Sequence, residues 1–297
     1  MQIAGISYQV NELFNVMSMS HFTIQKQLKK LWGSHQFDWS PPETYGPKNQ
    51  WEEYFTTNKY GVRLAALFGH AKTFPAKGSV LLGHPFRNDA KNYFLKSHHV
   101  SVLRNNGYHT MLFDFNGFGA SENGNMDYGE DIVAVGNLLA GVTPKLPIGY
   151  LGVSLGAGWG ILGLTAEAHP FKVAVLDSPI TSMSTFKYHF STVHRLLLCL
   201  AKASSTVDLA MSPWQAIKQI KHLDSVLLLY GGKDTIAPSG LGQILKYNSS
   251  VEVTLKVFEE ASHMKAIDHY PKAYELHLIR YLDLHLASRG RVFRSVS

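Results

Sequence analysis

The feature that most constrains the fold of this chain is the segment Ile148–Leu164, which reads IGYLGVSLGAGWGILGL. The apolar run at its start predicts a buried strand, and the small and apolar residues at its end predict a buried helix. Between them lies a G-x-S-x-G sequence centred on Ser154, with Gly152 and Gly156 on either side. A sharp strand-to-helix turn needs these glycines because larger side chains would collide with the strained serine. The motif therefore predicts a serine hydroxyl presented at a helix N-terminus, which stabilises a developing negative charge.

Short apolar segments alternate with helical segments over most of the remaining chain. The predicted strands are 51–57, 61–71, 79–83, 109–115, 148–151, 172–176, 225–230 and 251–258. The predicted helices outside the serine segment are 89–105, 128–140 and 270–286. The first two strands form an antiparallel pair, and the others are separated by helical segments, which is typical of parallel pairing. The pattern predicts an α/β fold with a mainly parallel twisted sheet and helices on both faces.

Two stretches fall outside this alternation. Residues 1–50 are predicted to be an N-terminal extension that ends in a proline-rich connector. Residues 51–290 are predicted to form the main domain. More than forty residues separate the strands that end near Ser178 and begin at Ser225, which is too long for a simple crossover. We therefore predict a small helical lid, inserted at about 180–222.

A serine hydroxyl is a weak nucleophile at neutral pH, so it needs a base and an acid that orients the base. The candidate base is His263, which follows the last predicted strand in the sequence EEASHM. The candidate acid is Asp234, which follows an apolar strand in the sequence LLYGGKDTIAP. The order Ser154, Asp234, His263 is the one expected for a triad on such a sheet. Asp177, at the end of the strand before the lid, is an alternative acid with a less well-defined turn.

Attack by serine creates an oxyanion, which fixed N–H groups must stabilise. The first predicted donor is the backbone N–H of Leu155, the residue after the nucleophile. The second should come from the loop after strand 79–83, where Pro85 has no N–H. Phe86 is therefore the predicted second donor, and His84 is interpreted as a residue that orders this loop.

The sequence offers no pattern for a metal, a cofactor or a nucleic acid. It contains no H-E-x-x-H and no phosphate-binding G-x-x-x-x-G-K-[ST], and residues 117–119 lack the third glycine of a dinucleotide fingerprint. The net charge of +6 comes from 28 basic and 22 acidic residues, and the basic ones are scattered. A nucleic-acid interface would instead show a basic stripe with interleaved aromatic residues. We predict no cofactor, no metal site and no nucleic-acid partner.

The apolar segments are short, and none approaches the roughly 20 residues needed to cross a bilayer. The first residues lack the charged and apolar regions of a secretory signal. Cys199 is the only cysteine, so no internal disulfide can form, which fits a reducing compartment. These features predict a cytoplasmic protein without an integral membrane segment.

Four motifs together resemble those of serine hydrolases in the α/β-hydrolase superfamily. They are LLGHPF, FDFNGFGASE, GVSLG, and LLLYGGKDTIAP followed by ASHM, and they occur in the order found in that superfamily. The second is similar to the D-x-x-G-x-G-x-S turn that borders the pocket in serine aminopeptidase-like and monoacylglycerol-lipase-like enzymes. The resemblance covers roughly residues 51–287 and implies an α/β-hydrolase fold. His-Pro at 84–85 replaces the more common His-Gly, which leaves the exact oxyanion donor open.

The predicted reaction is hydrolysis of a carboxylic ester through an acyl-enzyme, with a small-molecule acyl ester or thioester as partner. Apolar residues in the lid segment favour an acyl or aromatic ester, although they could equally pack the lid on the core. The leading alternative is a thioesterase or acyltransferase that acts on acyl chains bound to a carrier. The alternative from another class is a non-catalytic binding protein on the same scaffold. The lid residues are Phe186, Tyr188, Phe190, Leu196, Leu197, Leu198, Leu200 and Trp214.

Overall fold

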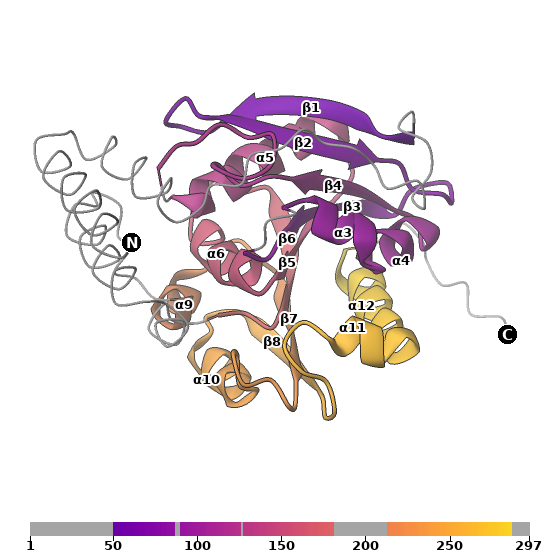
Figure 1. The fold of residues 1–297 in the computed structure, drawn as a ribbon, viewed down its shortest axis with the longest axis vertical. Helices are drawn as coiled ribbons and strands as arrows, with labels where there is room; N and C mark the ends of the chain where they lie inside the picture. Colours follow the sequence, from indigo (N-terminus) through magenta and orange to yellow (C-terminus); the bar gives the residue numbers. More distant parts are fainter. Residues whose placement is uncertain (1–49, 87–89, 126, 181–212, 287–297) are drawn as a thin grey trace, which may run out of the picture.

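The computed structural model describes residues 50–86, 90–125, 127–180 and 213–286, which form a sheet flanked by helices (Figure 1). The predicted extension and most of the predicted lid, residues 181–212, lie outside these ranges. The strands are β1 Glu52–Thr57, β2 Arg63–Gly69, β3 Gly78–Gly83, β4 Tyr108–Phe113, β5 Ile148–Val153, β6 Phe171–Asp177, β7 Ser225–Gly231 and β8 Glu252–Phe258. The helices are α3 Asn92–Lys96, α4 His99–Asn105, α5 Tyr128–Val142, α6 Leu155–Gly163, α9 Pro213–Ala216, η4 Ile217–Gln219, α10 Gly240–Asn248, α11 Ala266–His269 and α12 Pro271–His285.

The eight described strands form one sheet in the order β1-β2-β4-β3-β5-β6-β7-β8. β1 and β2 run antiparallel to their neighbours, and all other pairs are parallel. The predicted mainly parallel sheet with an antiparallel pair at its start is therefore confirmed. Because the carboxyl ends of parallel strands meet at one edge, the loops after β3, β4, β5, β6, β7 and β8 gather there.

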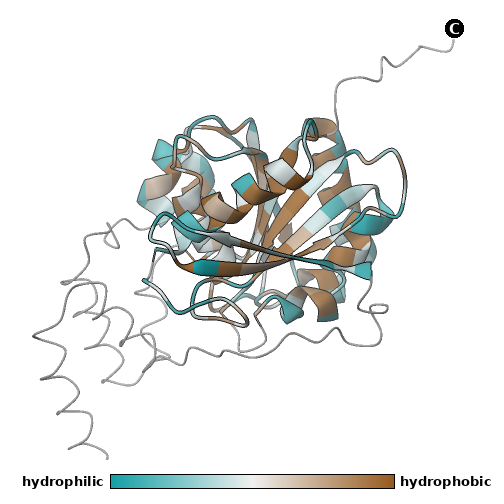
Figure 2. Ribbon diagram, turned by 90° about the horizontal axis from the view of Figure 1, so that it is seen from above, coloured by the Kyte–Doolittle hydropathy of each residue, from teal (hydrophilic) through white to brown (hydrophobic). Residues whose placement is uncertain are grey.

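Each side of the sheet packs against its own set of helices (Figures 1 and 2). Leu81 of β3 faces the core shared with α5, α6 and α10, whereas its neighbours Val80 and Leu82 face the core shared with α3, α4 and α12. This alternation follows from the two-residue period of a strand. It also explains why the central strands read as continuous apolar runs, since both of their faces are buried.

The structure corrects two details of the predicted helices. The segment predicted as one helix at 89–105 contains two, because the backbone of Ser97 is extended, with a ψ of 159°, between α3 and α4. Helix α10 lies between β7 and β8, where no helix is predicted. Its sequence, GLGQILKYN, contains two glycines, and its buried residues are Gly242 and Leu245. Glycine disfavours helix formation, so the two glycines in nine residues concealed this helix in the sequence.

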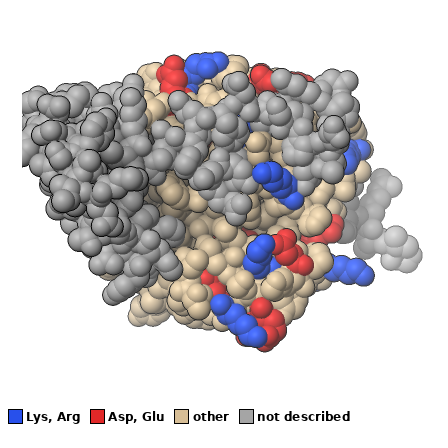
Figure 3. Space-filling model, viewed as in Figure 1, with Lys and Arg blue, Asp and Glu red and all other residues tan. Residues whose placement is uncertain are grey.

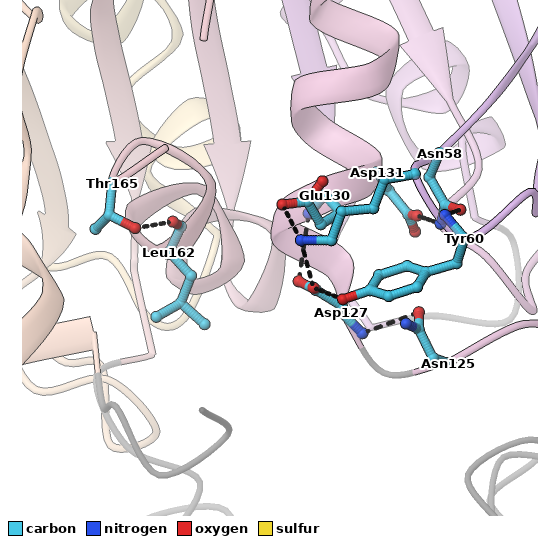
Figure 4. A network of polar contacts seen from close by, with 9 residues as sticks. Asn58, Tyr60, Asn125, Asp127, Glu130, Asp131, Leu162 and Thr165 are labelled. Atoms are coloured by element: carbon cyan, nitrogen blue, oxygen red, sulfur yellow. Dashed lines mark hydrogen bonds and ion pairs between the residues drawn. The ribbon is translucent and has the colours of Figure 1, made fainter. Parts of the chain in front are cut away.

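A buried polar network fastens the β1–β2 turn to helix α5 (Figure 4). The fully buried carboxylate of Asp131 accepts a hydrogen bond from Asn58 Nδ2 at 2.8 Å and two from Asn116, from the backbone N–H at 2.9 Å and from Nδ2 at 2.7 Å. At the start of α5, the Tyr60 hydroxyl donates to Asp127 Oδ2 at 2.9 Å. Burial raises the pKa of Asp127. Because Asn116 lies in the loop after β4, this network also holds one border of the carboxyl-end edge.

Candidate active site

Ser154 occupies the sharp turn between β5 and α6. Its backbone has φ 55° and ψ −116°, a conformation that residues with a side chain rarely adopt. Its N–H donates to the Asp177 carbonyl at 2.8 Å, and its own carbonyl accepts from Gly158 at 3.0 Å. The strain of this turn is therefore held by backbone hydrogen bonds from the neighbouring strand and from the helix.

The two glycines of the motif are required by close backbone approaches. A Cβ on Gly152 would lie 2.7 Å from the Ala157 Cα, and one on Gly156 would lie 2.2 Å from the Gly83 carbonyl oxygen. Gly83 pairs with Gly152 across β3 and β5, so the loop after β3 passes directly over the start of α6. The sequence prediction of a glycine-dependent strand–turn–helix unit is confirmed.

Gly156→Ala is expected to destabilise the protein by about 3 kcal/mol, because the new methyl group meets backbone oxygens that cannot rotate away. Urea unfolding followed by circular dichroism measures the effect. Gly141→Ala is the matched control, since a Cβ at this position in α5 has no atom within 4 Å. The control should gain about 0.5–1 kcal/mol from helix propensity. Equal midpoints for the two variants would contradict the packing described here.

The structure brings Ser154, His263 and Asp234 together in one hydrogen-bonded chain. Ser154 Oγ lies 2.8 Å from His263 Nε2, and His263 Nδ1 lies 2.7 Å from Asp234 Oδ2. The other carboxylate oxygen of Asp234 accepts the backbone N–H groups of Ile236 at 2.9 Å and Ala237 at 2.8 Å. Because a carboxylate only accepts, Nδ1 of His263 carries the proton and Nε2 is free to accept from the serine.

Asp177, the alternative acid, does not pair with His263. Its two carboxylate oxygens accept hydrogen bonds from the Tyr274 hydroxyl at 2.8 Å and the Ser178 hydroxyl at 2.9 Å. Burial raises the pKa of Asp177 to about 6, although these donors and the nearby His263 act in the opposite direction. The turn after β7, and not the end of β6, therefore supplies the carboxylate that contacts the histidine.

The loop after β3 is anchored by His84, which is fully buried. Its Nε2 accepts the backbone N–H of Phe115 at 3.2 Å, so its Nδ1 carries the proton and donates to the Pro85 carbonyl at 2.7 Å. Both ring nitrogens bind backbone atoms, which confirms the interpretation of His84 as a loop-ordering residue. Leu155 directly follows Ser154 as the first residue of α6, and Phe86 lies two residues after His84 in the loop; their role as oxyanion donors stays a prediction.

A buried ion pair that the sequence did not predict lies next to this loop. Lys91 Nζ contacts the carboxylate of Asp114, and both side chains are buried. Asp114 also accepts the backbone N–H groups of Lys91 at 3.0 Å and of Ala120 at 2.9 Å. A Cβ on Gly119 would lie 2.2 Å from Oδ2 of the same carboxylate, which explains the glycine in the FDFNGFGASE turn. The pair thus joins the segment after the β3 loop to the turn after β4.

Aromatic side chains form a second group at this edge that the sequence did not single out. The rings of Tyr128 and Trp159 stack with centroids 3.9 Å apart, and Phe115 meets Trp159 edge-on at 4.8 Å. Phe118 contacts Phe86 with ring centroids 5.5 Å apart. These residues come from four different segments, so only the folded sheet edge brings them together. In the described residues, no three His, Cys, Asp or Glu side chains are arranged to hold a metal ion.

Comparisons with known proteins agree with this architecture. The sequence model of the serine aminopeptidase S33 family matches residues 75–212. An esterase of Pyrococcus furiosus is similar in structure, with a TM-score of 0.63 and 19% identity over 84% of this chain and 95% of that one. An acylaminoacyl peptidase of Pyrococcus horikoshii has a TM-score of 0.56 and 16% identity, covering 82% of this chain and 43% of that one. No curated protein sequence matches.

The sheet order, the strained serine turn and these similarities define the class of protein. The chain has the α/β-hydrolase fold, and its residues 75–212 resemble the serine aminopeptidase S33 family in sequence. Among the helices of the described ranges, none has the length and apolar character needed to cross a bilayer.

Proposed function

We propose that this protein is a serine hydrolase that cleaves carboxylic esters through an acyl-enzyme intermediate. The observation that carries the proposal is the hydrogen-bonded chain from Ser154 Oγ through His263 to Asp234, with distances of 2.8 and 2.7 Å. A serine held in a strained turn at a helix N-terminus, with a histidine in the accepting tautomer, is the arrangement that nucleophilic catalysis requires.

In the proposed reaction, Ser154 Oγ attacks the ester carbonyl while His263 Nε2 accepts the hydroxyl proton. Asp234 holds the ring and stabilises its positive charge. The backbone N–H groups of Leu155 and Phe86 stabilise the oxyanion. His263 then donates its proton to the leaving alcohol, and it subsequently activates a water that releases the acid and restores the serine. The cycle needs no cofactor or metal.

An ester substrate is favoured by the esterase among the structural neighbours. A peptidase is the second candidate, because the matching family model describes a serine aminopeptidase and one neighbour is an acylaminoacyl peptidase. The two reactions share the acyl-enzyme step but differ in their leaving group. An amine is a poorer leaving group than an alcohol, so its departure depends more strongly on the proton donated by His263.

A thioesterase or acyltransferase that acts on carrier-bound acyl chains is the third candidate. On the face shown in Figure 3, basic and acidic side chains of the described residues lie next to one another, which gives no support to a uniformly basic docking surface. If an anionic carrier binds elsewhere, thioester turnover should fall as salt rises. The single cysteine, Cys199, supports a cytoplasmic location as part of the proposal.

The test combines covalent labelling with a substrate series. We expect a fluorophosphonate to label the wild-type protein, with the adduct mapped by mass spectrometry to Ser154 alone, because only an activated serine reacts. The same preparation should hydrolyse p-nitrophenyl esters in a series from acetate to palmitate, and a matched p-nitroanilide should be cleaved at least 100-fold more slowly. Faster cleavage of the anilide would identify a peptidase. Absence of both labelling and turnover would instead support a binding protein.

A further inference from the structure

We propose that Asp177 is a positioning residue for Ser154 and His263, acting through buried hydrogen bonds that reach the backbone at or beside each of them. The inference rests on the proposed function, because it concerns the pair that would carry out the reaction. Asp177 ends β6, is fully buried, and is not a member of the Ser154–His263–Asp234 chain.

The first arm of the network connects Asp177 to the backbone of Ser154 and to the backbone of the residue that follows His263. The Asp177 carbonyl accepts the Ser154 N–H at 2.8 Å, which fixes the turn that presents the nucleophile. The Ser178 hydroxyl donates to Asp177 Oδ1 at 2.9 Å, and its oxygen accepts the Met264 N–H at 3.4 Å. Because Met264 directly follows His263, the carboxylate holds the histidine loop through one intervening hydroxyl.

Backbone strain is concentrated along this arm. In the described residues, six non-glycine residues have positive φ, and three of them, Ser154 at 55°, Ser178 at 51° and Met264 at 59°, are the ones joined to Asp177. Such conformations cost about 1–3 kcal/mol each and persist only where the surroundings fix them. The hydrogen bonds around Asp177 therefore hold three strained residues that together set the position of Ser154 Oγ relative to His263 Nε2.

The second arm reaches from Asp177 to the helices on the other side of the site. The Tyr274 hydroxyl of α12 donates to Asp177 Oδ2 at 2.8 Å and lies 3.1 Å from His99 Nε2 of α4. The Ser97 hydroxyl lies 2.8 Å from His99 Nδ1. Burial lowers the pKa of His99 to about 3, so the ring is neutral and can accept from Ser97 while donating to Tyr274. The Ser178 and Tyr274 hydroxyls, one in each arm, both donate to the Asp177 carboxylate.

The charge of Asp177 is sensitive to pH. The ionisable groups that face it are Tyr274 of α12, Tyr230 of β7, Asp234 after β7 and His263 after β8. Burial raises the pKa of Asp177 to about 6, the hydroxyl donors and His263 oppose this increase, and Asp234 adds to it. Protonation would remove a negative charge near His263 and occupy an oxygen that now accepts a hydrogen bond. Full activity therefore requires both Asp177 and His263 to be deprotonated.

The test uses three variants in the full-length protein: Asp177→Asn, Tyr274→Phe and the control Tyr281→Phe. Tyr281 also lies on α12 and is buried, but its hydroxyl donates to Ser225 at 3.0 Å, away from this network. Two quantities are measured for each protein. One is the pH profile of kcat/KM with a p-nitrophenyl ester, and the other is the pH titration of the His263 ring by NMR, assigned with a His263→Gln variant. The NMR titration requires no turnover.

For the wild type, we expect the acidic side of the kcat/KM profile to be steeper than the loss of one proton would make it. The NMR titration of the His263 ring should likewise depart from a one-proton curve, because two coupled groups titrate. Asp177→Asn should lower kcat about tenfold and leave KM within about twofold of the wild-type value. In this variant, both the acidic side of the kcat/KM profile and the His263 titration should follow one-proton curves. Tyr274→Phe removes a donor that lowers the pKa of Asp177, so the acidic side of its profile should move about one unit toward higher pH. Tyr281→Phe should match the wild type.

The outcomes separate this inference from the proposed function. The wild type could hydrolyse none of the substrates while its His263 titration still differs from that of Asp177→Asn. In that case the proposed reaction fails and the positioning role stands. If the wild type is active but His263 titrates identically in the wild type, Asp177→Asn and Tyr274→Phe, the inference is overturned. If Asp177→Asn does not fold, the Tyr274→Phe comparison decides in the same way.

Discussion

Ser154→Ala is expected to lower kcat for ester hydrolysis about a million-fold while the protein remains folded. The variant loses the nucleophile, so no acyl-enzyme can form, and only the residual effect of binding and oxyanion stabilisation remains. The folding cost should be small, about 1 kcal/mol, since one hydrogen bond to His263 is lost and the backbone turn is unchanged. The loss of kcat is measured with the p-nitrophenyl ester, and the change in stability is measured by thermal unfolding followed by circular dichroism.

Two further variants separate chemistry from strain. Ser154→Gly should be equally inactive but about 1 kcal/mol more stable than Ser154→Ala, because glycine adopts a φ of 55° without the steric cost of a Cβ. Ser101→Ala, which alters a half-buried serine whose hydroxyl donates to the His98 carbonyl, should retain wild-type activity. Substantial turnover by Ser154→Ala, with Ser101→Ala unchanged, would exclude the acyl-enzyme mechanism at this serine.

The parts of the site that the sequence predicts well are those encoded within a few neighbouring residues. The glycines around Ser154 mark the elbow because the turn itself forbids side chains there, and the structure shows the close backbone contacts. The loop-ordering role of His84 follows in the same way, since both of its hydrogen bonds go to backbone at the carboxyl ends of β3 and β4. The alternation of apolar runs with helical segments predicted a mainly parallel sheet, but it did not predict the order of the strands in that sheet.

The parts that could not be predicted depend on partners far apart in the chain. Tyr274 reads as an ordinary apolar position of an amphipathic helix, yet its hydroxyl contacts a carboxylate 97 residues earlier. Lys91 and Asp114 likewise carry no local signal that they form a buried pair. Side-chain direction at the end of a strand is fixed by the sheet and by neighbouring helices, so only the structure distinguishes the environments of Asp177 and Asp234.

Asp234→Asn is expected to lower kcat about ten-thousand-fold with little effect on folding. The amide oxygen can still accept the N–H groups of Ile236 and Ala237, so the turn should keep its shape. The amide nitrogen, however, would face His263 Nδ1 and cannot accept its proton. The ring would then adopt the tautomer with hydrogen on Nε2, which cannot take the proton of the serine. Steady-state kinetics and urea unfolding check both parts of this expectation.

Asp268→Asn is the matched control for this variant. Asp268 also lies close to His263 in the chain, but it forms an exposed ion pair with Lys265 at 2.8 Å, and such pairs contribute little to stability. Its kcat should stay within about twofold of the wild type. Asp177→Asn is expected to lower kcat only about tenfold, so comparing it with Asp234→Asn shows which carboxylate supports His263. A larger loss for Asp177→Asn than for Asp234→Asn would reverse the assignment and make the carboxylate at the end of β6 the acid that supports His263.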